Sequence, residues 1–311
     1  EIILLGNVVT HLYLGLNAVL RASGHPKQAM YATIATVAIN TILAPIFIFM
    51  FDWGIRGAAI ATVSAQVIAL LWQLKQFNNA NELLHFRRGI FRLKRKIVFD
   101  SLAIGMSPFL MNLAACLIVI LINQGLKKYG GDLAIGAFGI VNRLVFIVVM
   151  IVMGLNQGMQ PIAGYNFGAK LYDRVNKVLK LTIIYATCVT TFGFLVGMLA
   201  PNLVVGIFTS DAELTELSAT GLRITVMFFP IIGFQMVTSN FFQSIGMAGK
   251  AIFLSLTRQM LILLPCLLIL PHFFGVAGVW YSMPVSDLLA SLIALVMLVY
   301  QFRKFKTAAA H

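Results

Sequence analysis

The chain has 311 residues, of which 60% are hydrophobic and 11% are charged, and its formal net charge is +13 at pH 7. Soluble domains carry roughly 25% charged residues, so this composition excludes an ordinary soluble globular protein. The basic balance does not require a nucleic-acid partner, because membrane proteins collect lysine and arginine in their cytoplasmic loops. We expect an integral membrane protein that binds no nucleic acid.

Apolar runs long enough to cross a bilayer recur along the chain. About 20 apolar residues span the hydrocarbon core as a helix, whose backbone satisfies its own hydrogen bonds. Barrel strands would instead alternate apolar and polar residues. We therefore expect an all-α, polytopic helical bundle with about nine transmembrane helices. The expected spans are 2–20, 28–50, 54–76, 98–126, 133–160, 176–208, 214–243, 251–271 and 275–302.

The basic residues predict which loops face the cytoplasm. Of the 23 lysines and arginines, 17 fall in alternate connections, whereas only Arg56, Lys127 and Lys128 fall in the opposite ones. Because positive charge is retained inside, we expect a cytoplasmic C-terminus and a basic cytoplasmic linker at 77–96. The last residues, 304–311, form a tail that we treat as a candidate appended segment.

Two stretches of the chain repeat each other. Residues 21–30 read "RASGHPKQAM" and residues 243–252 read "QSIGMAGKAI". A proline-bearing span and a G-x-x-G follow each, and the glycine spacings nearly agree: 30 residues from Gly24 to Gly54 and 29 from Gly246 to Gly275. Both turns fall on the cytoplasmic side by the charge distribution. This indicates a parallel repeat, which is a common transporter architecture.

The repeat predicts how the spans divide into lobes. The second copy begins near Ile97, about 149 residues before Gly246, whereas only 23 residues precede Gly24. We therefore expect a two-lobed 6+6 protein that is truncated at its N-terminus. Residues 1–76 would be the last three helices of the N-lobe, and residues 97–303 the six-helix C-lobe.

The sequence shows no constellation typical of an enzyme. Cys116, Cys188 and Cys266 lie in apolar spans and are interpreted as small hydrophobic residues, and the five histidines show no ligand spacing. We expect no catalytic residues, no metal site and no cofactor.

Several motifs resemble those of multidrug and toxic compound extrusion (MATE) transporters. They are "QPIAGYNFGA" (160–169), "NTILAPIFIF" (40–49) and "GAAIAT" (57–62). The pattern is most similar to the bacterial drug/cation antiporter branch. The resemblance implies a monomeric transporter, multi-pass in the bacterial inner (plasma) membrane. It would export amphipathic or cationic drugs in exchange for Na⁺ or H⁺ by alternating access between its lobes.

The resemblance also implies a cation site in the N-lobe. In that branch an acid on the first span joins an Asn-x-x-x-Asp pair before a proline and a hydroxyl from the sixth span. Here Asn40 and Thr62 match, but Ala44 stands where the acid is expected, and the first span is absent. The alternative is that Asn40 stabilises helix packing through hydrogen bonds.

Asp287 is the only acid near the middle of a span. At 1.5 Å per residue it lies about 18 Å from the outer end of its span, and Arg258 lies about 12 Å from the inner end of its own. These depths coincide in a hydrocarbon core of about 30 Å. We expect a buried Arg258–Asp287 pair, with a proton relay at Asp287 as the alternative.

Five amides interrupt otherwise apolar spans among many phenylalanines and methionines. Such a mixture suits a cavity for bulky amphipathic substrates, since methionine is flexible and polarizable. A bundle core with hydrogen-bonded amides is the alternative. The expected cavity residues are Asn112, Gln157, Gln160, Asn240 and Gln243.

A lipid-linked oligosaccharide flippase of related fold is the alternative function. Its cavity would need several basic side chains for a pyrophosphate group. Only Arg143, Arg223 and Arg258 lie within the expected spans, which favours the drug antiporter.

The charge distribution gives a testable topology. A cysteine introduced at Ser210, between the sixth and seventh expected spans, should react with a membrane-impermeant thiol reagent added to intact cells. Labelling that occurs only after the cells are permeabilised would reverse the predicted orientation.

Overall fold

The computed structural model describes residues 2–78, 85 and 94–309. The chain divides into two compact units, Glu1–Lys94 and Arg95–His311. Most of the basic linker expected at 77–96, and the last two residues of the tail, lie outside the described residues.

In its described residues, the first unit is a three-helix bundle: its first two helices form a hairpin, and both pack against the third helix. In the middle of that third helix, buried alanines recur at every fourth residue, at Ala61, Ala65 and Ala69. Small residues in such a stripe let helix backbones approach closely without a hydrophobic driving force from water. The elements are α1 (Ile2–Ala22), α2 (Pro26–Pro45), the π-helix η1 (Ile46–Met50) and α3 (Gly54–Phe77).

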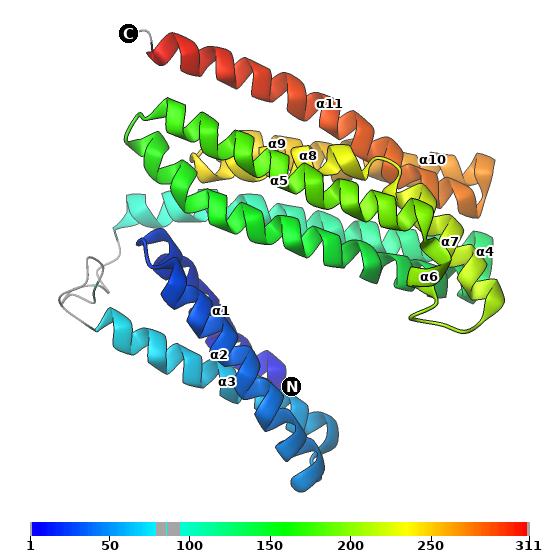
Figure 1. Cartoon of the computed structure of the whole chain (residues 1–311), viewed down its shortest axis with the longest axis horizontal. Helices are drawn as coiled ribbons and strands as arrows, with labels where there is room; N and C mark the ends of the chain where they lie inside the picture. The colour runs from blue at the N-terminus through cyan, green and yellow to red at the C-terminus, as the bar shows by residue number, and fades with distance from the viewer. Residues whose placement is uncertain (1, 79–84, 86–93, 310–311) are drawn as a thin grey trace. The chain divides into compact units, whose positions relative to one another are not determined.

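The second unit is a larger bundle whose long helices lie side by side (Figure 1). Its core holds fully buried apolar residues from several helices, including Phe241, Phe242 and Leu126. Its elements are α4 (Arg95–Gly168), α5 (Tyr172–Leu199), α6 (Pro201–Val205), α7 (Ala212–Val226), α8 (Phe229–Ser244), α9 (Ala248–Leu256), the π-helix η2 (Thr257–Leu263), α10 (Leu264–Phe274) and α11 (Val276–Ala309).

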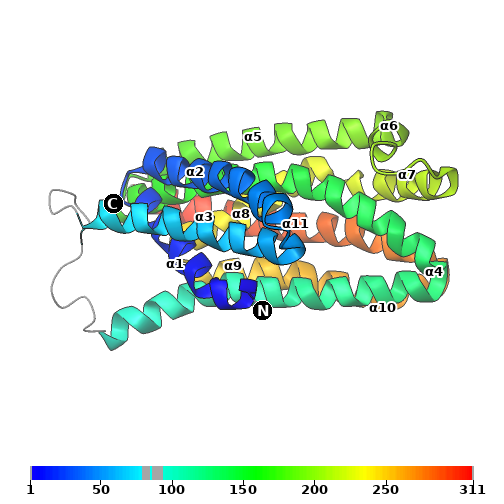
Figure 2. The same ribbon diagram turned by 90° about the horizontal axis from the view of Figure 1, so that it is seen from below.

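The 74-residue element α4 is two helices joined at a sharp turn. Gly131 has φ 67° and ψ −160°, a conformation that is accessible to glycine but not to residues with a Cβ atom. The chain reverses direction there (Figure 2). The two arms of α4 therefore correspond to the expected spans 98–126 and 133–160.

Two expected spans are interrupted where proline removes a backbone donor. Span 214–243 consists of α7 and α8, which meet at a bend of 55° just before Pro230. Span 176–208 ends its long helix at Leu199, and Pro201 then begins the short α6. On the far side of the following loop, Asp211 caps α7 by accepting hydrogen bonds from the backbone N–H groups of Glu213 and Leu214.

The sequence repeat is also a repeat of backbone geometry. Gly24 and Gly246 have positive φ values of 89° and 76°, and Gly54 and Gly275 have 50° and 57°. Three residues after the second glycine of each copy, Gly57 and Gly278 pack directly on the backbone of the preceding helix. The two hairpins thus use the same glycine positions for the same turns and close contacts.

Seven of the described helices are long and apolar enough to cross a membrane, or eight if the bent α7–α8 pair is one span. That number counts α4 once, although the turn at Gly131 divides it. Large apolar side chains remain highly exposed on these helices, for example Leu5, Ile55 and Phe192. The expected fold class, an all-helical polytopic membrane protein, is confirmed.

Candidate functional site

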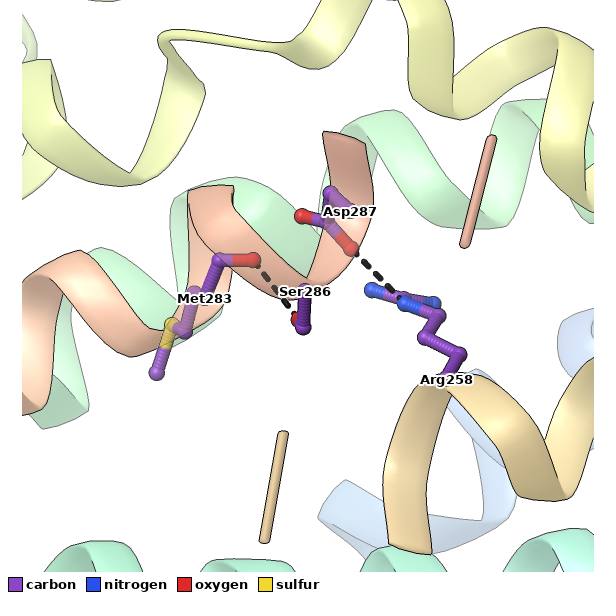
Figure 3. A network of polar contacts seen from close by, with 4 residues as sticks. All are labelled: Arg258, Met283, Ser286 and Asp287. Atoms are coloured by element: carbon purple, nitrogen blue, oxygen red, sulfur yellow. Dashed lines mark hydrogen bonds and ion pairs between the residues drawn. The ribbon is translucent and has the colours of Figure 1, made fainter. Parts of the chain in front are cut away.

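The second unit contains a buried ion pair between two of its helices. The Nε atom of Arg258, on η2, lies 2.7 Å from Oδ1 of Asp287, on α11 (Figure 3). The Asp287 side chain is 5% exposed and that of Arg258 is 31% exposed. The structure thus brings together the two residues that the sequence placed at matching depths.

Local sequence explains how α11 accommodates a carboxylate. Small residues surround it: Ala290 and Ser291 follow on the same face of the helix, and the adjacent Ser286 is also buried. Ser286 donates its hydroxyl hydrogen bond to the carbonyl of Met283 at 2.7 Å, within its own helix (Figure 3). Asp287 is therefore left to interact with a group from a neighbouring element.

Arg258 sits in an unusual segment of helix. Residues Thr257–Leu263 form a π-helix, and Pro265 follows within the first turn of α10. Proline cannot donate the N–H bond that a regular α-helix requires, and π-helical segments are frequent at functional sites. The irregular segment sets the direction from which Arg258 approaches α11.

A first cavity, here called the polar cavity, lies on one side of the pair and has a volume of about 220 Å³. Arg258 lines it together with three of the amides expected from the sequence, Asn112, Asn240 and Gln243. Further polar groups in its lining were not expected. They are Gln235, Ser239, Ser255 and Gln259.

The remaining two predicted amides behave differently from each other. Gln160 lies outside the lining but donates a hydrogen bond to Asn240 at 3.4 Å. Gln157 is exposed and is absent from the lining of the polar cavity. Its neighbour Asn156 is the buried amide of that turn, with an exposure of 1%.

Three residues that line the polar cavity each have an oxygen atom that is buried without a hydrogen-bond partner among the described residues. These atoms are Ser239 Oγ, Ser255 Oγ and Gln259 Oε1. Leaving a buried polar atom unpaired costs about 1–3 kcal/mol, so such atoms usually serve a further purpose. The polar cavity therefore has unused capacity to accept hydrogen bonds.

A second cavity, here called the apolar cavity, is lined by both residues of the pair and has a volume of about 350 Å³. Asp287 and Ser286 line it, and so do aromatic and sulfur-containing side chains. Arg258, Ala115 and Met236 line both cavities, so the two cavities adjoin at the ion pair. The large apolar side chains are Phe138, Phe146, Phe229, Met236 and Met283.

One sequence signal would have revealed part of the missed lining. Gln235, Ser239 and Gln243 recur at intervals of four residues, which places them on one face of α8. Ser255 and Gln259 have the same spacing. The polar residues of the apolar cavity, such as Asn142, Thr190 and Thr225, come from three different helices and show no such period.

The predicted cation-site residues both lie in the first unit, on different helices. The Oδ1 atom of Asn40, on α2, is buried and has no hydrogen-bond partner in the described part of the chain. The hydroxyl of Thr62, on α3, donates to the carbonyl of Ala58 at 3.0 Å. No hydrogen bond joins the two side chains within the described residues, so each presents an oxygen that is free to accept.

The chain is similar to several known proteins over nearly its whole length. The multidrug export protein MepA of Staphylococcus aureus (strain MSSA476) is 29% identical over 296 residues, covering 94% of this chain and 64% of the relative. MepA of Staphylococcus haemolyticus is 28% identical over 296 residues, which again cover 94% of this chain and 64% of the relative. The chain thus spans 64% of the length of these curated relatives.

Solved structures give the same result for the fold. The MATE multidrug transporter DinF-BH, in complex with R6G, is 35% identical, with a TM-score of 0.87 over 98% of this chain and 68% of that one. An outward-facing MATE transporter of the MOP superfamily is 22% identical, with a TM-score of 0.91 over 98% and 69% of the two chains.

The family model called MatE matches residues 104–268, which include Arg258, all the predicted amides and most of the lining of both cavities. This match covers more than half of the chain, and it agrees with the motifs, the fold and the relatives. The chain belongs to the MATE family of transporters.

Proposed function

We propose that the protein exports amphipathic, cationic drugs by antiport against Na⁺ or H⁺, with alternating access between two lobes. The observation that carries this proposal is the pair of adjoining cavities in the second unit. One is large and apolar with a carboxylate in its wall, and the other is lined with amides and hydroxyls. Relatives described as multidrug exporters support the same function.

The chemistry of the apolar cavity suits such a substrate. Ligand pockets usually enclose about 300–1,000 Å³ and combine apolar walls with a few placed polar groups. Phenylalanine and methionine side chains accept bulky bodies of varied shape, because they pack by dispersion and adapt their conformation. The carboxylate of Asp287 supplies the negative charge that would favour cations over neutral molecules.

The distribution of arginine argues against the flippase alternative. Of the three arginines in the expected spans, only Arg258 lines either cavity, and it is paired with an acid. Arg143 and Arg223 are exposed. A pyrophosphate group would require several unpaired cations around one cavity, so the lining supports a cationic rather than an anionic substrate.

We further propose that the coupling ion binds in the first unit at Asn40 and Thr62. A hard cation prefers oxygen ligands, and Asn40 Oδ1 is a buried oxygen without a partner among the described residues. The orientation expected from the charge distribution, with the C-terminus inside a bacterial plasma membrane, belongs to the same proposal. No cofactor is needed for it.

The drug-binding part of the proposal is tested by filling the cavities. Ala115 lines both of them, so Ala115→Phe should weaken binding of R6G to the purified protein by at least about tenfold through steric exclusion. Fluorescence polarisation in detergent measures the affinity. Leu113→Phe, on the same helix but at an exposed position outside both linings, is the matched control and should bind normally. Equal affinity in the Ala115→Phe variant would contradict a drug site here.

The ion site is tested by the ion dependence of efflux in vesicles. Asn40→Ala and Thr62→Val each remove an oxygen ligand, so both should weaken the dependence of drug efflux on the Na⁺ or H⁺ gradient. Thr41→Val is the control, because Thr41 is exposed and its hydroxyl bonds within its own helix. If both variants keep the ion dependence of the unmodified protein, Asn40 is a packing residue.

A further inference from the structure

We propose that Arg258 is an internal counter-ion that a cationic substrate displaces from Asp287. The substrate cation would take the carboxylate from the apolar cavity, and the guanidinium would turn into the polar cavity. This inference rests on the proposed function, because it names how the same cavities select a lipophilic monocation. Four features of the second unit carry it.

The first feature is the unequal position of the two partners. Asp287 lines only the apolar cavity, whereas Arg258 lines both cavities. The carboxylate is almost fully buried in α11, and the arginine side chain is about one-third exposed. A change of arginine rotamer therefore moves the guanidinium between the cavities, while the acid stays in place.

The second feature is that the ion pair uses only one of the hydrogen-bond donors of Arg258. A guanidinium has five N–H donors and binds a carboxylate best through two parallel hydrogen bonds. Arg258 donates only its Nε–H to Asp287, and within the described residues this is the only hydrogen bond of either side chain. Such a single contact is weaker than a bidentate pair, which makes it replaceable.

The third feature is a second set of acceptors for the guanidinium. Ser239, Ser255 and Gln259 line the polar cavity, as Arg258 does. One oxygen atom of each is buried and has no hydrogen-bond partner among the described residues. Ser255 precedes Arg258 by three residues and so lies on the same side of its helix. These oxygens can accept the N–H donors that are released when the ion pair opens.

The fourth feature is the balance of charge. The pair is neutral, so a monocation that enters the apolar cavity leaves one net positive charge in the bundle. A buried charge without hydrogen bonds is expensive in a membrane. The oxygens of the polar cavity reduce this cost by solvating Arg258, so the two cavities would act together and the substrate would carry one positive charge.

The test uses methyltriphenylphosphonium, a lipophilic monocation without hydrogen-bond donors. Its binding to the purified protein in detergent is measured by calorimetry at one pH for all variants. Asp287→Asn removes the binding charge and should weaken binding by about tenfold or more. Arg258→Gln removes the competitor and should strengthen binding by roughly fivefold. Opposite signs are expected because the two residues have opposite roles.

Matched controls remove the same charges elsewhere in the second unit. Arg143→Gln and Asp132→Asn change exposed residues that line neither cavity, and both should bind methyltriphenylphosphonium with unchanged affinity. Melting temperatures of all variants show whether each one folds. If both Arg258→Gln and Asp287→Asn weaken binding while folded, the pair is purely structural and the inference is overturned.

A second comparison leaves Asp287 untouched and remains informative if Asp287→Asn fails to fold. Gln259→Leu removes an acceptor of the polar cavity, so it should weaken methyltriphenylphosphonium binding by about threefold in the presence of Arg258. The same substitution should have no effect in the Arg258→Gln background. An equal effect in both backgrounds would overturn the role of the polar cavity. A protein without any substitution that fails to bind the cation would overturn the proposed function itself.

Discussion

A charged pair in an apolar bundle is the constraint on which the described site of the second unit depends. An isolated carboxylate or guanidinium at membrane depth is costly, so each needs an opposite charge or hydrogen-bonding groups beside it. Arg258 and Asp287 therefore fix the position of η2 against α11. Arg258 lines both the polar and the apolar cavity, and Asp287 lines the apolar one.

Irregular helices make this arrangement possible. The π-helix η2 and the bend between α7 and α8 interrupt two spans near the cavities, and a proline follows each break closely. Non-helical backbone at membrane depth is tolerated where it is buried in protein or lines a cavity, so both breaks fit this position. Gly278, packed on the backbone of α10, and the turn at Gly275 then hold α11 closely against its preceding helix.

The sequence predicted the contact between Arg258 and Asp287, but it predicted only part of the cavity lining. The regular rise of a helix was enough to place Arg258 and Asp287 at one level, and positive-φ glycines marked the repeated turns. Successive side chains on a helix point about 100° apart, however, so a span with correct bounds does not determine which of its residues face the bundle interior. Gln157 was expected in the cavity, yet Asn156 is the buried amide. The residues Asn142, Thr190 and Thr225 meet only through tertiary packing, which no local pattern encodes.

The central claim, that Arg258 and Asp287 are energetically coupled, is tested most directly by a double-mutant cycle. The free energy of unfolding in detergent is measured for Arg258→Gln, for Asp287→Asn, for both together and for the unmodified protein. Removing one partner strands the other charge, so the double variant should be more stable than the sum of the single losses predicts, by at least about 1 kcal/mol. Single losses that add to within about 0.5 kcal/mol would contradict direct coupling.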